Sequence, residues 1–218
     1  MGFFYSVVGR HNARMNTDQQ ANIDAMVRAI SETLFSAWSY FHLLEGFHAG
    51  SKSHPVVTQK FDRLFDQVWR AVFDGLFAKA GTLIDRTKTT YSLPNLVTMV
   101  RRYGGAELKL AAKTVEGRLN AKDGPLAKIE SWRHQVVAHR TPSGRADIFF
   151  KNNQMKLDEV AEGLRELEKL LNTLSLEALR IHNDTETGSL DLVQQGTDLF
   201  ACVGRHHAEQ TQSQKGAQ

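Results

Sequence analysis

The sequence predicts an all-α protein, folded as an up-and-down bundle of four to six helices. Along several long segments, apolar residues recur at intervals of three or four, which places them on one face of an α-helix. Gly and Pro residues punctuate the chain between these segments. The stretch 146–155 has no helical period and could form a loop or a small hairpin. The sequence has no Gly-rich phosphate loop of the Rossmann or P-loop type.

Two long helices are expected in the first part of the chain. The first should begin near Thr17 or Asp18 and end between Gly46 and Gly50. Its apolar stripe consists of Ile23, Val27, Ile30, Leu34, Trp38, Phe41 and Leu44. The second should begin near Pro55 and has a wide apolar surface, which predicts that it is the most buried helix. That surface consists of Phe61, Phe65, Val68, Trp69, Val72, Phe73, Leu76 and Phe77.

Shorter helices are expected in the middle of the chain. The residues from Asp85 to Thr90 are predicted to form a loop. Ser92 and Pro94 then mark the start of a helix, because proline costs little in a first turn. Two consecutive glycines should end this helix, and another is expected over 105–120. The interruption at 122–125 separates it from a helical segment that continues toward residue 140.

The clearest amphipathic helix begins at Leu157. Its stripe alternates steps of four and three and consists of Val160, Leu164, Leu167, Leu171 and Leu174. Asp158 and Glu159 lie at the N-terminal end, where the helix dipole favours negative charge. Because the stripe is short, packing within a bundle is the ordinary explanation, and dimerisation is the alternative.

We divide the chain into an N-terminal segment (1–16), a helical domain (17–183) and a C-terminal extension (184–218). The extension is rich in Thr, Gln, Gly and Ser, and its last ten residues are expected to be disordered. The single cysteine, Cys202, excludes a disulfide framework within the chain and a multi-cysteine zinc site. Without a signal peptide or a stretch of membrane-spanning length, we expect a cytoplasmic protein with no membrane partner.

Neither a metal site nor a cofactor is predicted. No two histidines form the i, i+4 pair with a carboxylate that a zinc hydrolase helix uses. The net charge of +3 is small, but from Thr98 to Arg145 ten Lys or Arg residues stand against four Asp or Glu residues. Such a segment would attract a nucleic-acid backbone, although it could also be the solvated face of a helix.

One segment, Ser131–Arg140 with the sequence SWRHQVVAHR, suggests chemistry. Arg133 carries a permanent planar cation that matches phosphate oxygens, and histidine exchanges protons near neutral pH. Six residues separate Arg133 from His139, a rise of ~9 Å and a rotation of ~600° along a regular helix, so the two share one side only loosely. We therefore expect either a second subunit or a bent or ending helix, which Pro142 and Gly144 favour.

The pattern Arg133-His134-x4-His139 resembles the Arg-polar-x4-His signature of HEPN domains (higher eukaryotes and prokaryotes nucleotide-binding). The run Val-Val-Ala-His-Arg at 136–140 also resembles the abortive-infection AbiU-like subgroup, in which the motif ends one long helix and another helix follows. In organisation the likeness covers residues 17–180. It implies an HEPN-like all-α fold and a metal-independent endoribonuclease of phage defence or of a toxin–antitoxin system.

The resemblance implies that Arg133 and His139 are catalytic residues. The ribose 2′-hydroxyl would attack the adjacent phosphate, His139 would transfer a proton, and Arg133 would neutralise charge on the five-coordinate phosphate. His134 and Arg140 would support the site or contact RNA. The implied partners are RNA, a second copy of the chain in a homodimer, and an antitoxin.

Other interpretations of the same residues stay open. Arg133 could pair with Glu130, and His139 could cap its own helix, where a cation is favoured. The chain would then be a non-catalytic HEPN-like module for RNA or protein binding. A third possibility is a partner-binding protein organised by the stripe from Leu157 to Leu174.

Overall fold

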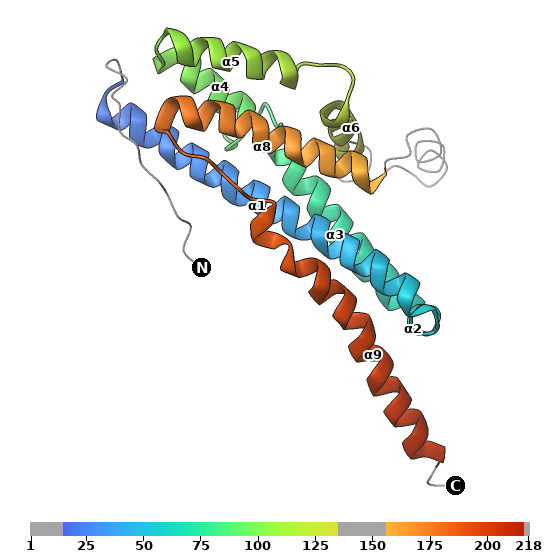
Figure 1. Cartoon of the computed structure of the whole chain (residues 1–218). Coiled ribbons are helices and arrows are strands. Elements are labelled where there is room, and N and C mark those ends of the chain that lie inside the picture. Colours follow the sequence, from blue (N-terminus) through green and yellow to red (C-terminus); the bar gives the residue numbers. More distant parts are fainter. Residues whose placement is uncertain (1–14, 135–155, 216–218) are drawn as a thin grey trace.

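The computed structural model describes residues 15–134 and 156–215 (Figure 1). These residues form eight α-helices, one short 3-10 helix and no strand, which confirms the all-α class. The elements are α1 (Thr17–Ser53), α2 (Pro55–Lys60), α3 (Asp62–Leu83), α4 (Leu93–Tyr103), α5 (Ala106–Leu119), α6 (Pro125–Trp132), α8 (Leu157–Leu179), η2 (Thr187–Ser189) and α9 (Asp191–Lys215). The helices outnumber the expected four to six because the second is split at Phe61 and the C-terminal extension adds α9.

Helix α1 is the central element of the bundle and begins where the sequence predicts. Asn16 caps it: the Asn16 Oδ1 atom accepts from the backbone N–H of Gln19 at 2.8 Å, and the Gln19 side chain accepts from the backbone of Asn16. Every residue of the predicted stripe is buried. The helix packs against α3, α8 and α9, so it supplies one wall of the core along most of its length.

The prediction that the second long helix is the most buried is wrong. Only the C-terminal half of α3 lies deep in the main core, where Leu76 and Phe77 are fully buried. Its N-terminal half extends to the far end of the bundle, where Leu64 is 54% exposed and Phe65 is buried. There it packs in a second, smaller cluster of apolar side chains. The helices α4, α5, α6 and α8 cover only the other end of the bundle (Figure 1). The wide apolar surface of α3 is therefore shared between two clusters.

The opposite end of the bundle is built from α4, α5, α6 and α8. The predicted break at Gly104 separates α4 from α5, and both pack on α8. All five residues of the predicted α8 stripe are buried, which confirms bundle packing for this face. Ion pairs join the edges of these helices: Arg118 of α5 with Glu166 of α8, at 2.7 Å, and Lys128 of α6 with Glu159 of α8.

The C-terminal extension folds back along α1 and then leaves the bundle (Figure 1). Helix α9 crosses α1 at Gly46 and Gly196. The two backbones can approach this closely because both residues lack a side chain, and a side chain at Gly46 would overlap the backbone of α9. Phe200 anchors it by stacking on Phe65 with ring centroids 4.2 Å apart. Disorder was expected over the last ten residues, whereas α9 continues as a helix to Lys215.

In the parts of the chain that the structure describes, no helix combines the length and the apolar composition needed to cross a membrane.

Candidate functional site

The motif begins at the C-terminal end of α6. Gly124, with a φ of 93°, and Pro125 at the helix start set its beginning. The helical backbone continues into Arg133, whose φ of −54° and ψ of −48° are those of an α-helix. Arg133 and His134 are thus placed by the structure, whereas His139, Arg140 and the expected helix end before Pro142 lie outside the described residues.

Trp132 packs this end of α6 against α3. Its ring stacks on Phe77 with centroids 5.6 Å apart and meets the edge of Phe73 at the same distance. Leu126 and Ile129 are buried on the same side, at the spacing of one helix face. Because Trp132 is held in the core, the adjacent Arg133 emerges beside the last turn of α3.

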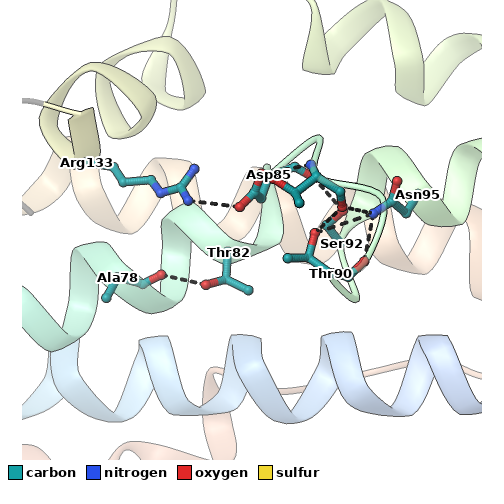
Figure 2. A network of polar contacts seen from close by, with 8 residues as sticks. Ala78, Thr82, Asp85, Thr90, Ser92, Asn95 and Arg133 are labelled. Carbon is teal, nitrogen blue, oxygen red and sulfur yellow. Dashed lines mark hydrogen bonds and ion pairs between the residues drawn. The ribbon is translucent and has the colours of Figure 1, made fainter. Parts of the chain in front are cut away.

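Asp85, the second residue after α3, is the ion-pair partner of Arg133. The Nη2 atom of Arg133 donates to the Oδ2 atom of Asp85 at 2.9 Å (Figure 2). The two side chains are 28% and 18% exposed, so the pair is partly sheltered from water. Such a pair is worth more than a fully exposed one, and removing one partner leaves a partly buried charge.

Gly81 makes room for the stem of Arg133. A Cβ atom added to Gly81 would overlap the Cδ atom of Arg133 and would lie 2.7 Å from its Cγ atom. Gly81 lies in the last turn of α3, and Asp85 lies two residues beyond the end of this helix. Arg133 is therefore contacted at two points: the backbone of Gly81 in α3 packs against its aliphatic part, and the Asp85 carboxylate in the following loop binds its guanidinium group.

The carboxylate of Asp85 is itself fixed by the loop that follows α3. Its Oδ1 atom accepts from the backbone N–H and from the hydroxyl of Thr87, both at 2.9 Å. The hydrogen bond from the Thr87 backbone, followed by those from the Thr87 hydroxyl and Arg133, lowers the pKa of Asp85 below its usual value despite partial burial. At neutral pH this group is a carboxylate with both oxygens occupied.

The remainder of the loop is tied to α4. The Nδ2 atom of Asn95 donates to the carbonyl oxygens of Thr87 and Thr90, both at 2.7 Å, and the hydroxyl of Ser92 donates to the carbonyl of Asp85 at 2.6 Å (Figure 2). Ser92 therefore holds the loop instead of capping α4 with its side chain. The predicted loop is confirmed, and it is an ordered support for Arg133.

The sequence offered Glu130 as a possible ion-pair partner of Arg133. Glu130 is exposed, and Arg133 pairs with Asp85 instead. Sequence reasoning missed both Asp85 and Gly81. An Asp followed two residues later by Thr is typical of a hydrogen-bonded turn and could have drawn attention to Asp85. Nothing local shows that this turn meets a motif 48 residues away.

Acidic residues offset much of the basic excess counted between Thr98 and Arg145. Among the described cations of that segment, Arg101 pairs with Glu116 at 2.7 Å, and three others pair with residues outside the segment. Those three are Arg118, Lys128 and Arg133. Arg102, Lys109, Lys113 and Lys122 are exposed on α4, on α5 and after α5. The positive charge is therefore more local than the sequence count indicates.

The arrangement at Arg133 suits the binding of an oxyanion. A guanidinium group has five N–H donors in a fixed plane, and the described contact with Asp85 uses one nitrogen. The group is partly exposed, so a phosphate can approach from solvent while Asp85 and Gly81 hold the other side. Such a preorganised cation can stabilise charge that develops on a phosphate.

The contact with Gly81 predicts an unusual mutant cycle. Gly81→Ala should lower the free energy of unfolding by about 1–3 kcal/mol, because the new methyl group strikes the Arg133 stem. In an Arg133→Ala background the same change should instead stabilise by about 0.5–1 kcal/mol, since alanine favours helix over glycine. Urea unfolding of the four proteins measures both effects. A loss of equal size in both backgrounds would contradict the packing described.

The lowered pKa of Asp85 predicts a pH dependence of stability. A carboxyl group with a depressed folded pKa stabilises the fold above its unfolded pKa, near the ordinary value of 3.8, and loses this effect as the pH falls through the folded pKa. Wild type should therefore be more stable than Asp85→Asn by a constant margin from neutral pH to about pH 5, and the margin should shrink below about pH 4. Urea titrations at several pH values measure it; a margin independent of pH down to pH 2.5 would be the opposite result.

Comparison with protein-family models places this geometry in context. The model of the HEPN AbiU2 family matches residues 20–194, which include all but the first turn of α1, the helices from α2 to α8, the Asp85 loop and the whole motif. Searches of curated proteins and of solved structures each found no match. The matched region is well over half of the chain and agrees with the all-α fold. The chain belongs to the HEPN family of AbiU2 proteins, an abortive-infection type of HEPN module.

Proposed function

We propose that this protein is a metal-independent endoribonuclease that acts on RNA in the cytoplasm, in phage defence or in a toxin–antitoxin system. The observation that carries the proposal is the fixed and partly exposed position of Arg133, the first residue of the motif. It is fixed by Asp85 and Gly81 and yet is partly exposed at the end of a helix. These contacts give the guanidinium group a defined position, from which its remaining donors can meet a phosphate.

In this mechanism the 2′-hydroxyl of the ribose forms a bond to the adjacent phosphorus, and the bond from phosphorus to the 5′-oxygen of the next nucleotide breaks. His139 takes the proton of the 2′-hydroxyl or delivers a proton to the leaving 5′-oxygen, and solvent water carries the other of these two protons. Arg133 binds the non-bridging oxygens, on which charge accumulates in the transition state. The products are a 2′,3′-cyclic phosphate and a 5′-hydroxyl.

His134 and Arg140 have supporting roles in the proposal. His134 is exposed beside Arg133 and would orient it or touch RNA. Arg140 would contact a neighbouring phosphate. Two copies of the chain would bring their motifs to one groove, and an antitoxin would act by covering it. These roles rest on the family, and the exposed position of Arg133 is compatible with them.

A non-catalytic HEPN-like module is the second candidate, and one observation favours it. The ion pair with Asp85 and the packing on Gly81 also describe a residue that joins α6 to α3 for stability alone. In such a protein the exposed cations of α4 and α5 would bind RNA without cutting it. The two candidates differ in RNA cleavage: a ribonuclease cuts RNA and loses this activity without Arg133, whereas a binding module does not cut RNA at all.

The direct test is cleavage of labelled total RNA in the presence of EDTA. Arg133→Ala and His139→Ala should each lower the rate by at least about 100-fold, because each removes a group used in the transition state. Glu130→Ala is the matched control, since Glu130 is exposed on the same turn of α6 and should leave the rate within about twofold.

Folding and oligomeric state of each variant are checked by circular dichroism and by sedimentation. A 2′,3′-cyclic phosphate at the new end would support the proposed step. Retention of full activity in folded His139→Ala would exclude the mechanism. If the wild type cuts none of several RNAs but binds them, the non-catalytic module becomes the better description.

A further inference from the structure

A small hollow lies beside the loop that supports Arg133. It has a volume of about 170 Å³ and lies between this loop, α4 and the end of α5. Its lining includes Arg86, Asn95, Thr98, Glu116, Leu119 and Asn120. In Figure 2, Arg133 and Asn95 lie on opposite sides of the loop. The family comparison and the proposed mechanism assign no role to this hollow.

Hydrogen bonds connect a wall of the hollow to Arg133. The Asn95 side chain donates to the carbonyl of Thr87 at 2.7 Å, and Thr87 donates twice to Asp85 at 2.9 Å. Asp85 then holds Arg133 at 2.9 Å. Arg86, which directly follows Asp85, lines the hollow. A group bound in the hollow is therefore positioned by the same loop that positions Arg133.

The polar wall carries both donors and acceptors at defined places. The Nη2 atom of Arg86 donates to the Oδ1 atom of Asn120 at 2.8 Å, which fixes the orientation of that amide. Within the described residues, the Nδ2 atom of Asn120 donates no hydrogen bond, so it is left to recognise a ligand. The carboxylate of Glu116 is balanced by Arg101, whose Nη1 atom donates to both of its oxygens at 2.9 and 2.7 Å.

The remaining wall is apolar. Val97 is buried, and Pro94 and Leu119 are half-buried at the edge of the hollow. This apolar edge is small, and a flat ring can lie across it and the exposed Arg86 guanidinium while its own edge meets the amides. This combination matches an unstacked RNA base, which proteins hold by stacking it on apolar or guanidinium surfaces and by hydrogen bonding to its edges. The hollow is too small for a helix or a folded partner.

We propose that this hollow is a base-binding subsite, which takes the base of a nucleotide next to the phosphodiester at Arg133. The proposal rests on the proposed ribonuclease function for its substrate. Asn120 and Arg86 are then specificity residues: they select which base occupies the subsite and therefore where the RNA is cut. They do not touch the reacting atoms.

Cleavage of a randomised single-stranded RNA pool, with sequencing of the product ends, tests the proposal. The wild type should prefer one base at a position next to the cut. Asn120→Asp should change that preference, because it replaces the amide donor with an acceptor and keeps the partner of Arg86. Arg86→Ala should weaken the preference, whereas Lys88→Ala, which removes an exposed cation from the same loop outside the hollow, should preserve it.

A binding measurement separates this proposal from the ribonuclease function. Titration of the four ribonucleoside monophosphates, followed by nuclear magnetic resonance, should show binding to the wild type and about tenfold weaker binding to folded Asn120→Asp. If the wild type cuts RNA but both variants keep its base preference and its nucleotide affinity, the subsite is wrong and the ribonuclease function stands. If the wild type cuts no RNA but Asn120→Asp weakens nucleotide binding, the base site stands and the ribonuclease function fails. Absence of nucleotide binding to the wild type overturns the subsite.

Discussion

The ion pair between Arg133 and Asp85 is the contact on which the candidate site depends. It joins Arg133, the residue after α6, to Asp85, the second residue after α3, 48 positions away, and both side chains are partly sheltered from water. A charge in such a place is costly without its partner, so each residue constrains the other. Thr87 adds two hydrogen bonds to the carboxylate and Gly81 removes the steric obstacle, so Arg133 has a defined position before any ligand arrives.

The rest of the bundle supports that contact. Helix α1 provides the core wall on which α3 packs, and Trp132 ties α6 to α3 through Phe77. Helix α8 covers α5 and α6 and pairs with their cations through Glu159 and Glu166. These acidic residues lower the overall positive field of the region. Recognition of a polyanion would therefore depend on a few placed groups, above all Arg133, more than on a broad basic surface.

Periodicity in the sequence predicted the elements whose contacts are regular. The stripes of α1 and α8 are buried as expected, because one face of a long amphipathic helix has to be covered. Periodicity failed for α3, since its apolar surface faces two separate clusters and neither encloses it completely. A stripe shows which residues seek burial, but it does not show how far the neighbouring helices reach.

The candidate site was predicted only in part for a similar reason. The motif pointed to Arg133, and the HEPN AbiU-like resemblance is confirmed by the family match. Local spacing offered Glu130 as a possible partner of Arg133, whereas the observed partner, Asp85, comes from a loop distant in sequence. Gly81 had no sequence signal, since its role is to have no side chain where another chain segment passes. The roles of His139 and Arg140 stay predictions, as both lie outside the described residues.

The most direct test of this account is the coupling energy between Asp85 and Arg133. Free energies of unfolding are measured for the wild type, Asp85→Ala, Arg133→Ala and the double variant at neutral pH. We expect a favourable coupling of about 1–2 kcal/mol, because each single variant leaves the other charge without its partner. Additivity within about 0.3 kcal/mol would contradict it, since the two residues would then act independently and Asp85 would not hold Arg133 in place.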